Sequence, residues 1–476
     1  MKKLLISTVA MCFSVSVMAG GLNTNSNQNA SFERQMSQNG IIDIAGMYAN
    51  PAGTAFLAKG WHFQLTNMSV WQQRNITTTF PLFALNGANS TPGETTHKFK
   101  GTAKAPVIPS FSVSYNQEKW SVNAHFAVTG GGGKCNFPNG LGSFESLVAG
   151  KIASLVPSFR GYLMDSQMEG HSYIFGGQFG ATYKVVPNLS VFGGVRVVYG
   201  TNGYDGYIKN ITAVVPNPAD PTSNMSLTQA QVPELADVTL DCSQKGWGVT
   251  PVVGLDWKAN EYLNLGVKFE APTKMVYKNT STLSPAAQAA SELAKFRDGY
   301  KVREDLPAIL SLGAMATPFE GLRLMTGWNV YFDSGVRKGL TADDGTELSF
   351  YKAGEYRPSE TDPEHLMIRD IDANTWELNI GVEYDLNKYV TLSGSWQRTV
   401  YGISDTGISD LSFNNTNNMF AFGVRVKPIQ HLSFDLGFMH TIYHDRSVTT
   451  STPAGYKNDL FIRKNDVLGV GINYEF

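Results

Sequence analysis

The sequence predicts an all-β fold: a 14-stranded antiparallel transmembrane β-barrel with an N-terminal segment in its interior. Apolar and polar residues alternate over repeated stretches of about 10 to 12 residues, the pattern of strands with one apolar and one polar face. Very short turns alternate with long polar loops, as they do in bacterial barrels. The 47 glycines and the aromatic content of 12% agree with a sheet that has many turns.

Charge and the first residues narrow the class of protein. The 38 basic and 40 acidic residues balance, so the chain lacks the basic character that a nucleic-acid partner requires. Lys2 and Lys3 precede an apolar stretch over 4–17, and Ala19 stands where signal peptidase accepts a small residue, which predicts a signal peptide over 1–19. The apolar stretch is shorter than the ~20 residues of a spanning helix, and no later stretch approaches that length. An exported chain of this kind would cross a membrane with strands.

The alternation places fourteen strands. In the cleanest hairpin, Phe111, Val113 and Tyr115 share one face, and the alternation resumes at Trp120 after a short turn. The expected strands are at 61–72, 106–116, 120–128, 171–185, 189–200, 246–257, 261–271, 306–318, 321–332, 374–385, 389–400, 417–427, 431–441 and 464–476. Short turns join the two strands of each hairpin, and long loops join successive hairpins.

The strands favour a membrane barrel over a soluble β-sandwich. A strand of ~11 residues tilted by ~40° rises about 25 to 28 Å, enough for the hydrocarbon layer, whereas sandwich strands are about half as long. The apolar faces begin or end in Trp, Tyr or Phe, as interfacial aromatic girdles do, and the opposite faces carry charges that suit a lumen. The even strand number places both chain ends and the short turns on the periplasmic side. The C-terminal Phe476 is then the expected signal for the barrel assembly machinery.

Residues 20–60 show no strand alternation, and we expect them to form a hatch inside a barrel that spans 61–476. Within this segment, Asn50, Pro51, Ala52 and Gly53 predict a compact turn, because Pro51 fixes φ and disfavours helix at Asn50 while Gly53 tolerates positive φ. A 14-stranded lumen exceeds what wall side chains fill, and a segment of about 40 residues is of the right size to occupy it.

The order of these features resembles the FadL family of outer-membrane transporters for long-chain fatty acids, which includes toluene and xylene carriers. The resemblance rests on the motif of Asn50 to Gly53 in a short N-terminal segment, on fourteen strands that end in Phe476, and on stretches such as 109–111, 306–313 and 376–384. It implies a monomer in which the N-terminal segment is a hatch, a kinked third strand opens the wall sideways, and ligand is captured outside and released into the bilayer. The chain departs from the family just before the motif. The family commonly has small and acidic residues there, whereas residues 41–46 of this chain include three isoleucines.

Two local patterns agree with that implication. The third strand ends in Gly130, Gly131, Gly132 and Gly133, which tolerate a bulge or strong bend, so a wall opening is expected there; the alternative is a plain flexible loop start. In the next loop, apolar residues recur at helical spacing and predict an outer amphipathic helix that forms a hydrophobic groove or packs on the barrel rim. These residues are Leu141, Phe144, Leu147, Val148, Ile152, Leu155, Val156 and Phe159. A second helical stretch at 286–296 is a possible partner.

Four cations on lumenal faces could meet a ligand carboxylate: Arg196, Lys268, Arg323 and Arg425. The competing expectation is that they pair within the wall, because several carboxylates share their faces. Those carboxylates are Asp256, Glu270, Glu377, Glu383 and Asp435.

Cys135 and Cys242 remain after export, and an oxidising periplasm permits a disulfide that the sequence does not decide.

The function expected from these patterns is passive uptake of hydrophobic molecules across the outer membrane, without cofactor, metal or catalytic residues. The partners are a hydrophobic small molecule or fatty acid, and outer-membrane lipid and lipopolysaccharide. A general porin is the main alternative, but it does not need the 40-residue hatch. A barrel hydrolase is the other alternative, and it is disfavoured because His125 faces inward without an obvious nucleophile, His440 and His444 lie near a rim, and no metal-binding spacing occurs.

Overall fold

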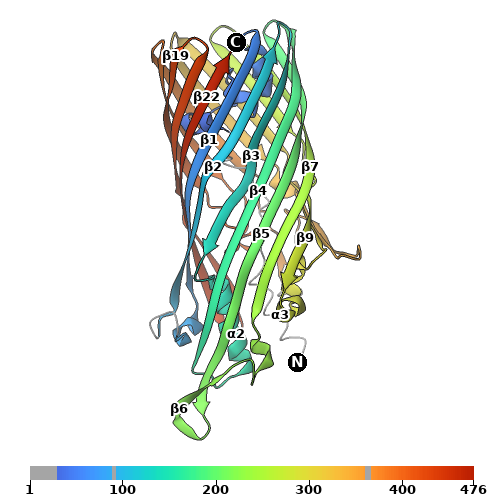
Figure 1. Cartoon of the computed structure of the whole chain (residues 1–476), viewed down its shortest axis with the longest axis vertical. Coiled ribbons are helices and arrows are strands. Elements are labelled where there is room, and N and C mark those ends of the chain that lie inside the picture. Colours follow the sequence, from blue (N-terminus) through green and yellow to red (C-terminus); the bar gives the residue numbers. More distant parts are fainter. Residues whose placement is uncertain (1–28, 88–92, 360–365) are drawn as a thin grey trace.

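Fourteen strands form one closed antiparallel ring, which confirms the expected barrel (Figure 1). The structure, a computed structural model, describes residues 29–87, 93–359 and 366–476; the signal peptide expected at 1–19 and residues 20–28 of the expected hatch lie outside them. Ring closure comes from β22, which pairs with β1 over 62–79. The ring strands are β1 (Gly60–Thr79), β2 (Thr96–Asn116), β3 (Trp120–Phe137), β4 (Gly161–Val186), β5 (Leu189–Asn217), β7 (Val238–Lys258), β8 (Leu263–Glu270), β11 (Ile309–Phe319), β12 (Leu322–Tyr331), β17 (Thr375–Asn387), β18 (Val390–Val400), β19 (Asn417–Ile429), β20 (Leu432–Tyr443) and β22 (Gly455–Glu475).

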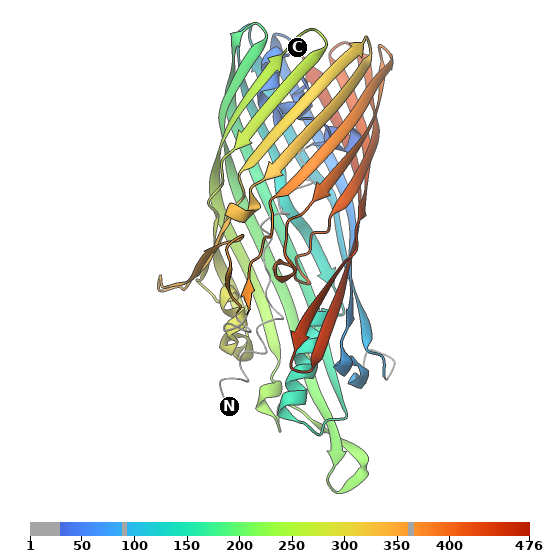
Figure 2. The ribbon, with the colours of Figure 1, turned by 180° about the vertical axis from the view of Figure 1, so that it is seen from behind.

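The two ends of the barrel differ. Short connections such as 117–119, 187–188 and 320–321 gather at one end, the turn end, where the Trp61 N–H donates to the Phe476 carbonyl at 2.7 Å. The long connections extend from the other end, the loop end, and contain most of the additional elements (Figure 2). These are β6 (Asp220–Leu227), β9 (Val276–Leu283), β10 (Lys301–Glu304), β13 (Arg337–Thr341), β14 (Glu347–Lys352), β15 (Arg357–Pro358), β16 (Met367–Ile368), β21 (Arg446–Thr452), α2 (Gly142–Leu155), α3 (Pro285–Ala289), η4 (Pro81–Leu85), η5 (Pro233–Leu235), η6 (Ser291–Phe296), η7 (Asp333–Gly335) and η8 (Asp405–Gly407).

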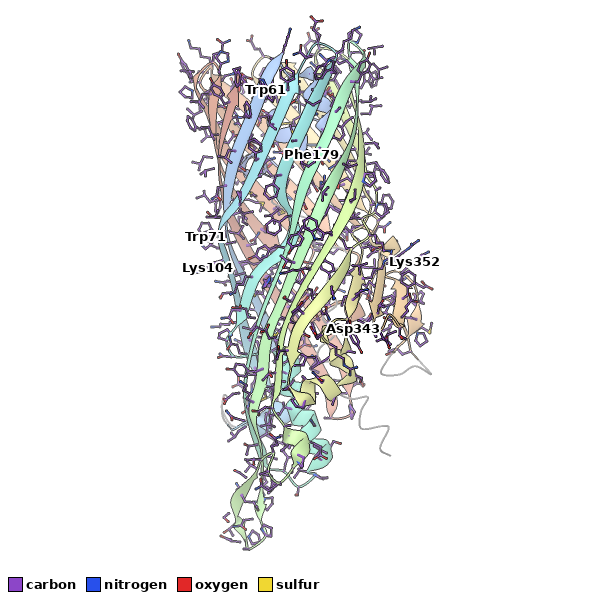
Figure 3. The ribbon with its side chains drawn as sticks, turned by 45° about the vertical axis from the view of Figure 1, so that its right-hand side comes forward. Trp61, Trp71, Lys104, Phe179, Asp343 and Lys352 are labelled. Atoms are coloured by element: carbon purple, nitrogen blue, oxygen red, sulfur yellow. The ribbon has the colours of Figure 1, made fainter. Side chains whose placement is uncertain are left out.

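The outer surface of the ring carries the expected apolar faces. Trp61 and Trp71 project from β1 (Figure 3) and are 39% and 45% exposed, and Leu65 between them is 55% exposed. On the opposite face of the same strand, Gln64 and Thr66 are buried in the interior. No helix among the described residues is long and apolar enough to cross a membrane. In the turn-end half, therefore, the apolar side chains face outward and the polar side chains face inward.

The loop-end half reverses this polarity. β5 has 29 residues rather than the twelve expected at 189–200. In its distal part Asp205 is exposed on the outside, while Tyr204 and Ile208 are buried in the interior. The predicted strand at 189–200 ends too early because the apolar face of the distal part no longer marks the lipid side.

A large apolar cluster fills the loop-end interior, and we call it the loop-end cluster. Its buried residues include Ile76, Phe80, Phe83, Phe99, Phe137, Phe144, Val148, Ile152, Tyr162, Met168, Tyr204, Ile208, Phe296, Phe413 and Phe461. The predicted outer helix is observed as α2; Phe144, Val148 and Ile152 are buried in this cluster, and Leu147, Leu155 and Phe159 pack partly buried against it. The second helical stretch is broken into α3 and η6, which contribute to the same cluster. Cys135 and Cys242 are buried there as free thiols.

Candidate functional site

Residues 29–59, here called the N-terminal segment, pack against inward-facing side chains of the turn-end half. The segment contains α1 (Ala30–Arg34), η2 (Ile44–Met47) and η3 (Pro51–Phe56). The side chains of Asn29 and Asp43 cap the first two helices, and Pro51 occupies the first position of η3, where its missing N–H removes no hydrogen bond. The segment therefore consists of short helical turns joined by irregular backbone, and these turns occupy the centre of the barrel.

Polar side chains of the wall bind this segment along its length. The Ser31 hydroxyl donates to Asp435 at 2.8 Å, and the Asn264 side chain donates to the Gly40 carbonyl at 2.9 Å. Glycines on the wall let the backbone approach closely: a Cβ on Gly437 would lie 2.4 Å from the Arg34 backbone nitrogen. The contacts join residues up to 404 positions apart in the chain.

The motif at 50–53 closes a turn and attaches it to the wall. Gly53 donates its N–H to the Asn50 carbonyl at 3.1 Å, and a side chain on Gly53 would meet the Asn50 amide at 2.6 Å. Asn50 donates its side-chain amide to Asp256 on β7, and the Ala52 carbonyl accepts from Ser190 on β5 at 2.7 Å. The predicted compact turn is present, and the Asn50 amide N–H and the Ala52 carbonyl find partners in the barrel wall. Gly53 does not adopt positive φ; a glycine is needed there because a side chain would meet Asn50.

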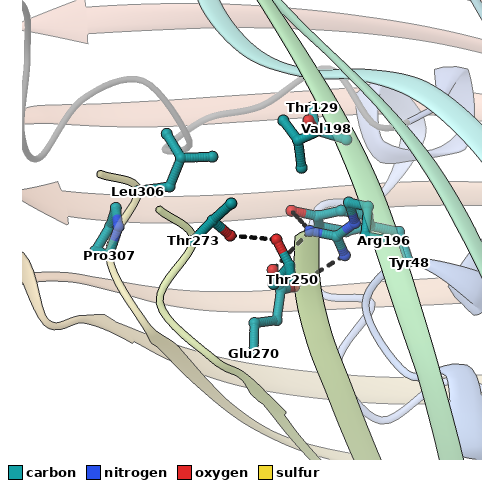
Figure 4. Close-up of a pocket in the computed structure, with 9 residues that line it drawn as sticks. All are labelled: Tyr48, Thr129, Arg196, Val198, Thr250, Glu270, Thr273, Leu306 and Pro307. Carbon is teal, nitrogen blue, oxygen red and sulfur yellow. Dashed lines mark hydrogen bonds and ion pairs between the residues drawn. The ribbon is translucent and has the colours of Figure 1, made fainter. Parts of the chain in front are cut away.

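A charged layer surrounds Tyr48 of this segment, and its Arg196 and Glu270 line the cavity drawn in Figure 4. Arg196 and Lys268 both lie over the Tyr48 ring, each 4.3 Å from the ring centroid. Glu270 accepts from both cations at 2.6 Å, so the three charges form one buried network. The cavity at this level has a volume of about 10 Å³, close to the minimum for one water molecule. Tyr48 and its charged neighbours therefore leave room for about one water molecule in the cavity that they line.

The other two predicted cations are also ion-paired. Arg323 contacts Glu383 at 2.9 Å and Asp385 at 2.7 Å, and Arg425 contacts Asp435 at 2.7 Å. Both line a polar cavity of about 310 Å³ between the N-terminal segment and the wall. All four cations that the sequence analysis proposed as carboxylate partners thus have carboxylates of the protein as neighbours. The observed pairing matches the competing expectation that these cations pair within the wall. It arises because acidic residues lie on the same inward faces.

The ring is interrupted between β2 and β3. These strands pair at 111–116 with 121–126 and again at 102–103 with 135–136, but residues 104–110 of β2 have no partner on β3. Pro106 and Pro109 lie in this stretch and lack the N–H that a ladder needs. We call the interruption the wall gap.

β3 bends at the same place. Between Val128 and Lys134 it advances six residues while β4 advances four, from Phe175 to His171, so β3 carries two extra residues. Gly131, at φ +112°, belongs to this bulge, and a Cβ there would lie 2.3 Å from a β4 carbonyl oxygen. The predicted glycine run is therefore located at the wall gap.

Directly behind the wall gap lies a second apolar cluster, the methionine cluster. Its buried members are Ala30, Met36, Met68, Ile108, Met419, Ala421, Met439 and Val467, with Phe32, Val70, Ala105 and Val128 packed against them. Members come from the N-terminal segment, from the far wall and from both edges of the gap. Methionine side chains adapt to irregular shapes, so this cluster can repack around an apolar guest. No sequence pattern predicts this cluster, because its methionines occur one at a time on inward faces that are otherwise polar.

Solved structures identify the architecture. No protein-family model and no curated protein matches the chain. A Pseudomonas aeruginosa FadL homologue is 15% identical, with a TM-score of 0.65, and the match covers 96% of this chain and all of that one. The Pseudomonas putida toluene transporter TodX is 14% identical, with a TM-score of 0.59 and coverage of 97% and 100%. The Ralstonia pickettii toluene transporter TbuX is 14% identical, with a TM-score of 0.53 and coverage of 91% and 94%.

The chain has the FadL-type fold. In this FadL-type barrel the structure brings together two residues that the strand pattern did not link. The Ser112 hydroxyl lies 2.9 Å from Nδ1 of His125, and both residues are buried. The other ring nitrogen of His125 is buried and has no hydrogen-bond partner among the described residues, so no carboxylate orients the ring. The described residues also contain no group of three or more His, Cys, Asp or Glu side chains that could hold a metal ion.

Replacing Glu270 tests the charged layer of the FadL-type barrel. Glu270→Gln leaves Arg196 and Lys268 buried without their shared anion, so we expect the free energy of unfolding to fall by about 3 to 5 kcal/mol. Urea-induced unfolding in lipid vesicles measures this loss. Glu261→Gln, at an exposed turn, is the matched control and should change stability by less than about 0.5 kcal/mol. Equal stabilities for the two variants would contradict the network.

Proposed function

We propose that this chain is a passive channel for hydrophobic molecules in a bacterial outer membrane. The observation that carries the proposal is the wall gap with the methionine cluster behind it. An interruption in the hydrogen-bonded wall exposes backbone groups and is costly within lipid, so its presence beside an adaptable apolar interior suits a lateral exit for an apolar solute. TodX and TbuX, which share this fold, are toluene transporters, and this agrees with the proposed class of ligand.

The path we propose begins at the loop end. A solute enters the loop-end cluster beneath α2, whose residues Phe144, Val148 and Ile152 would repack around it. It then moves to the methionine cluster and leaves through the wall gap into the outer leaflet. The N-terminal segment acts as a hatch that closes the polar route toward the turn end. Binding along this path must be strong enough to capture the solute and weak enough to release it.

The outer-membrane location is part of the proposal. The export signal expected at 1–19 and the apolar outward faces of the turn-end half support it. In this orientation the turn end faces the periplasm and the loop end faces the medium, where lipopolysaccharide slows the entry of apolar solutes.

Two other functions predict different measurements. A porin would conduct ions freely, whereas the charged layer around Tyr48 and Glu270 leaves a cavity of about 10 Å³. A hydrolase could use Ser112 and His125, which lie 2.9 Å apart. No described carboxylate bonds to His125, so this pair is the weaker candidate.

Reconstituted protein distinguishes the three functions. We expect proteoliposomes to take up a long-chain alkyl solute or toluene at least ~10-fold faster than protein-free vesicles, with near-silent conductance in planar bilayers and no ester hydrolysis. Steady ion conductance without solute uptake would favour the porin. Hydrolysis of an ester that is abolished by Ser112→Ala would favour the enzyme.

A further inference from the structure

Three lysines lie side by side on the outer surface of the sheet, and we call them the lysine row. Lys245 on β7 is the register partner of Lys278 on β9, and Lys278 is the register partner of Lys301 on β10. All three side chains are exposed. Neighbouring strands are ~4.8 Å apart, so the row is about 10 Å long. Like charges directly opposite each other on neighbouring strands destabilise a sheet, so this row needs a reason.

The charges of the lysine row are not compensated within the part of the chain that the structure describes. No ion pair or hydrogen bond joins any of its three ammonium groups to another described residue. The row continues through Thr341 on β13 to Glu347 on β14, but this carboxylate forms no ion pair with a lysine of the row. Asp241 shares the outward face of β7 and lies four residues from Lys245, which is about 13 Å along the strand.

The lysine row lies where the lipid-facing surface ends. On β7 the outward side chains from Trp257 to Trp247 are all apolar, and the next outward side chain is Lys245. The ten residues from Trp257 to Trp247 on a tilted strand cross about 25 Å, the height of the apolar band of a membrane barrel. Trp247 is 66% exposed, and its ring centroid lies 4.5 Å from that of Tyr199 on β5. Such aromatic residues mark a membrane interface, so the row lies at the depth of the lipid head groups on the loop-end side.

The sheet that carries the lysine row continues beyond the ring. β10 pairs with β13, and β13 pairs with β14, in the part of the sheet that carries Asp343 and Lys352 and stands away from the barrel (Figure 3). Arg337 and Lys352 are register partners there, and both are exposed. The outward surface at this depth is therefore basic along several strands, with an apolar band directly beside it on the membrane side.

We propose that the lysine row binds the phosphate groups of lipopolysaccharide in the outer leaflet. The proposal rests on the outer-membrane location proposed above and not on the transport activity. A phosphate between two lysines removes their repulsion and accepts from both ammonium groups. The acyl chains lie along the apolar band below Trp247, where Val249 and Val253 are exposed. The disaccharide of lipopolysaccharide carries a phosphate at each end and can follow a row of about 10 Å, whereas a glycerophospholipid with one phosphate neutralises only part of it.

Binding to the purified mature chain tests the site. Native mass spectrometry in detergent measures the affinity for lipid A, the acylated disaccharide of lipopolysaccharide with both phosphates, for lipid A without its phosphates, and for phosphatidylglycerol. Wild-type protein should bind bisphosphorylated lipid A about 10- to 100-fold more tightly than either other probe. The triple variant Lys245→Gln, Lys278→Gln and Lys301→Gln should lose this preference, while its affinity for dephosphorylated lipid A stays within about twofold.

Two matched variants make the result specific to the row. Lys59→Gln, Lys119→Gln and Lys388→Gln together remove the same charge from exposed positions at the turn end and should retain the preference. The triple Lys→Arg variant of the lysine row keeps its charge and should retain most of the preference. Loss of the preference in the turn-end variant as well would assign the binding to net charge and overturn the site.

Unfolding distinguishes a binding row from a structural one. In vesicles of zwitterionic lipid, the triple glutamine variant of the row should unfold at the same urea concentration as wild type or a higher one, because the repulsion is gone. Lipopolysaccharide added to these vesicles should raise the midpoint of wild type alone. A variant that is less stable than wild type without lipopolysaccharide would mean that the lysines serve the fold, against the proposal.

The remaining outcomes separate the site from the channel. A preference for bisphosphorylated lipid A that persists in the triple glutamine variant overturns the site. Equal binding of phosphatidylglycerol by wild-type protein also overturns it, because the row would then accept any anionic lipid. Both results leave the uptake of hydrophobic solutes intact. If the mature chain does not insert into bilayers, the outer-membrane location fails and the site fails with it.

Discussion

Deleting residues 29–58 is expected to convert a nearly silent barrel into an ion-conducting pore. These residues occupy the turn-end interior through bonds such as those from Ser31 to Asp435 and from Asn264 to Gly40. A 14-stranded ring is wider than its own inward side chains can fill, so removing the segment should raise single-channel conductance at least ~10-fold. Planar-bilayer recording of the deletion variant, with residues 1–28 kept for export, measures the change.

The controls separate opening from misfolding. Heat-modifiable migration on gels reports whether the closed ring forms without its N-terminal segment. A variant in which residues 29–58 are replaced by a Gly/Ser chain of equal length restores mass without the specific bonds and should conduct at an intermediate level. If the folded deletion variant stays silent, the segment is not what closes the lumen.

Much of the fold follows from local physics. A strand that faces lipid on one side and a polar interior on the other must alternate, so the fourteen ring strands of the turn-end half are readable from the sequence alone. The motif at 50–53 is also local, because Pro51 fixes its own φ and disfavours helix at Asn50 wherever this pair of residues occurs. The pairing of Arg196 and Lys268 with Glu270 was an expected alternative, since all three lie on inward faces.

The remaining features depend on contacts between distant parts of the chain. In the distal part of β5, Tyr204 and Ile208 face an apolar interior and Asp205 faces outward, which reverses the signal that marks a lipid-facing strand. The lysine row exists only because β7, β9 and β10 pair. No pattern within a single strand indicates it. Pro106 and Pro109 are the one local signal that could have sharpened the prediction of the wall gap.

Removing the bulge in β3 is expected to reduce uptake strongly while leaving the barrel folded. β3 has two residues more than β4 between Val128 and Lys134, so deleting residues 131–132 allows one continuous register from Val128 to the end of the strand. A deletion of two residues keeps every later side chain on its own face, whereas a deletion of one would exchange inside and outside. The straightened strand would lie closer to β2 and narrow the wall gap.

If the wall gap is the exit, the uptake rate of hydrophobic solute by this variant should fall by at least about 10-fold, to near the rate of protein-free vesicles. Its thermal stability should equal or exceed that of wild type, because ladder hydrogen bonds replace a bulge. Deleting residues 222–223 from the exposed β6 extension is the matched control for chain shortening. Wild-type uptake by the straightened barrel would exclude the wall gap as the route and direct attention to the cavity of about 310 Å³ beside the N-terminal segment. Loss of uptake in the straightened barrel alone would mean that the solute leaves between β2 and β3, because the N-terminal segment and the lumen are the same in both variants and the control alone shortens the loop end.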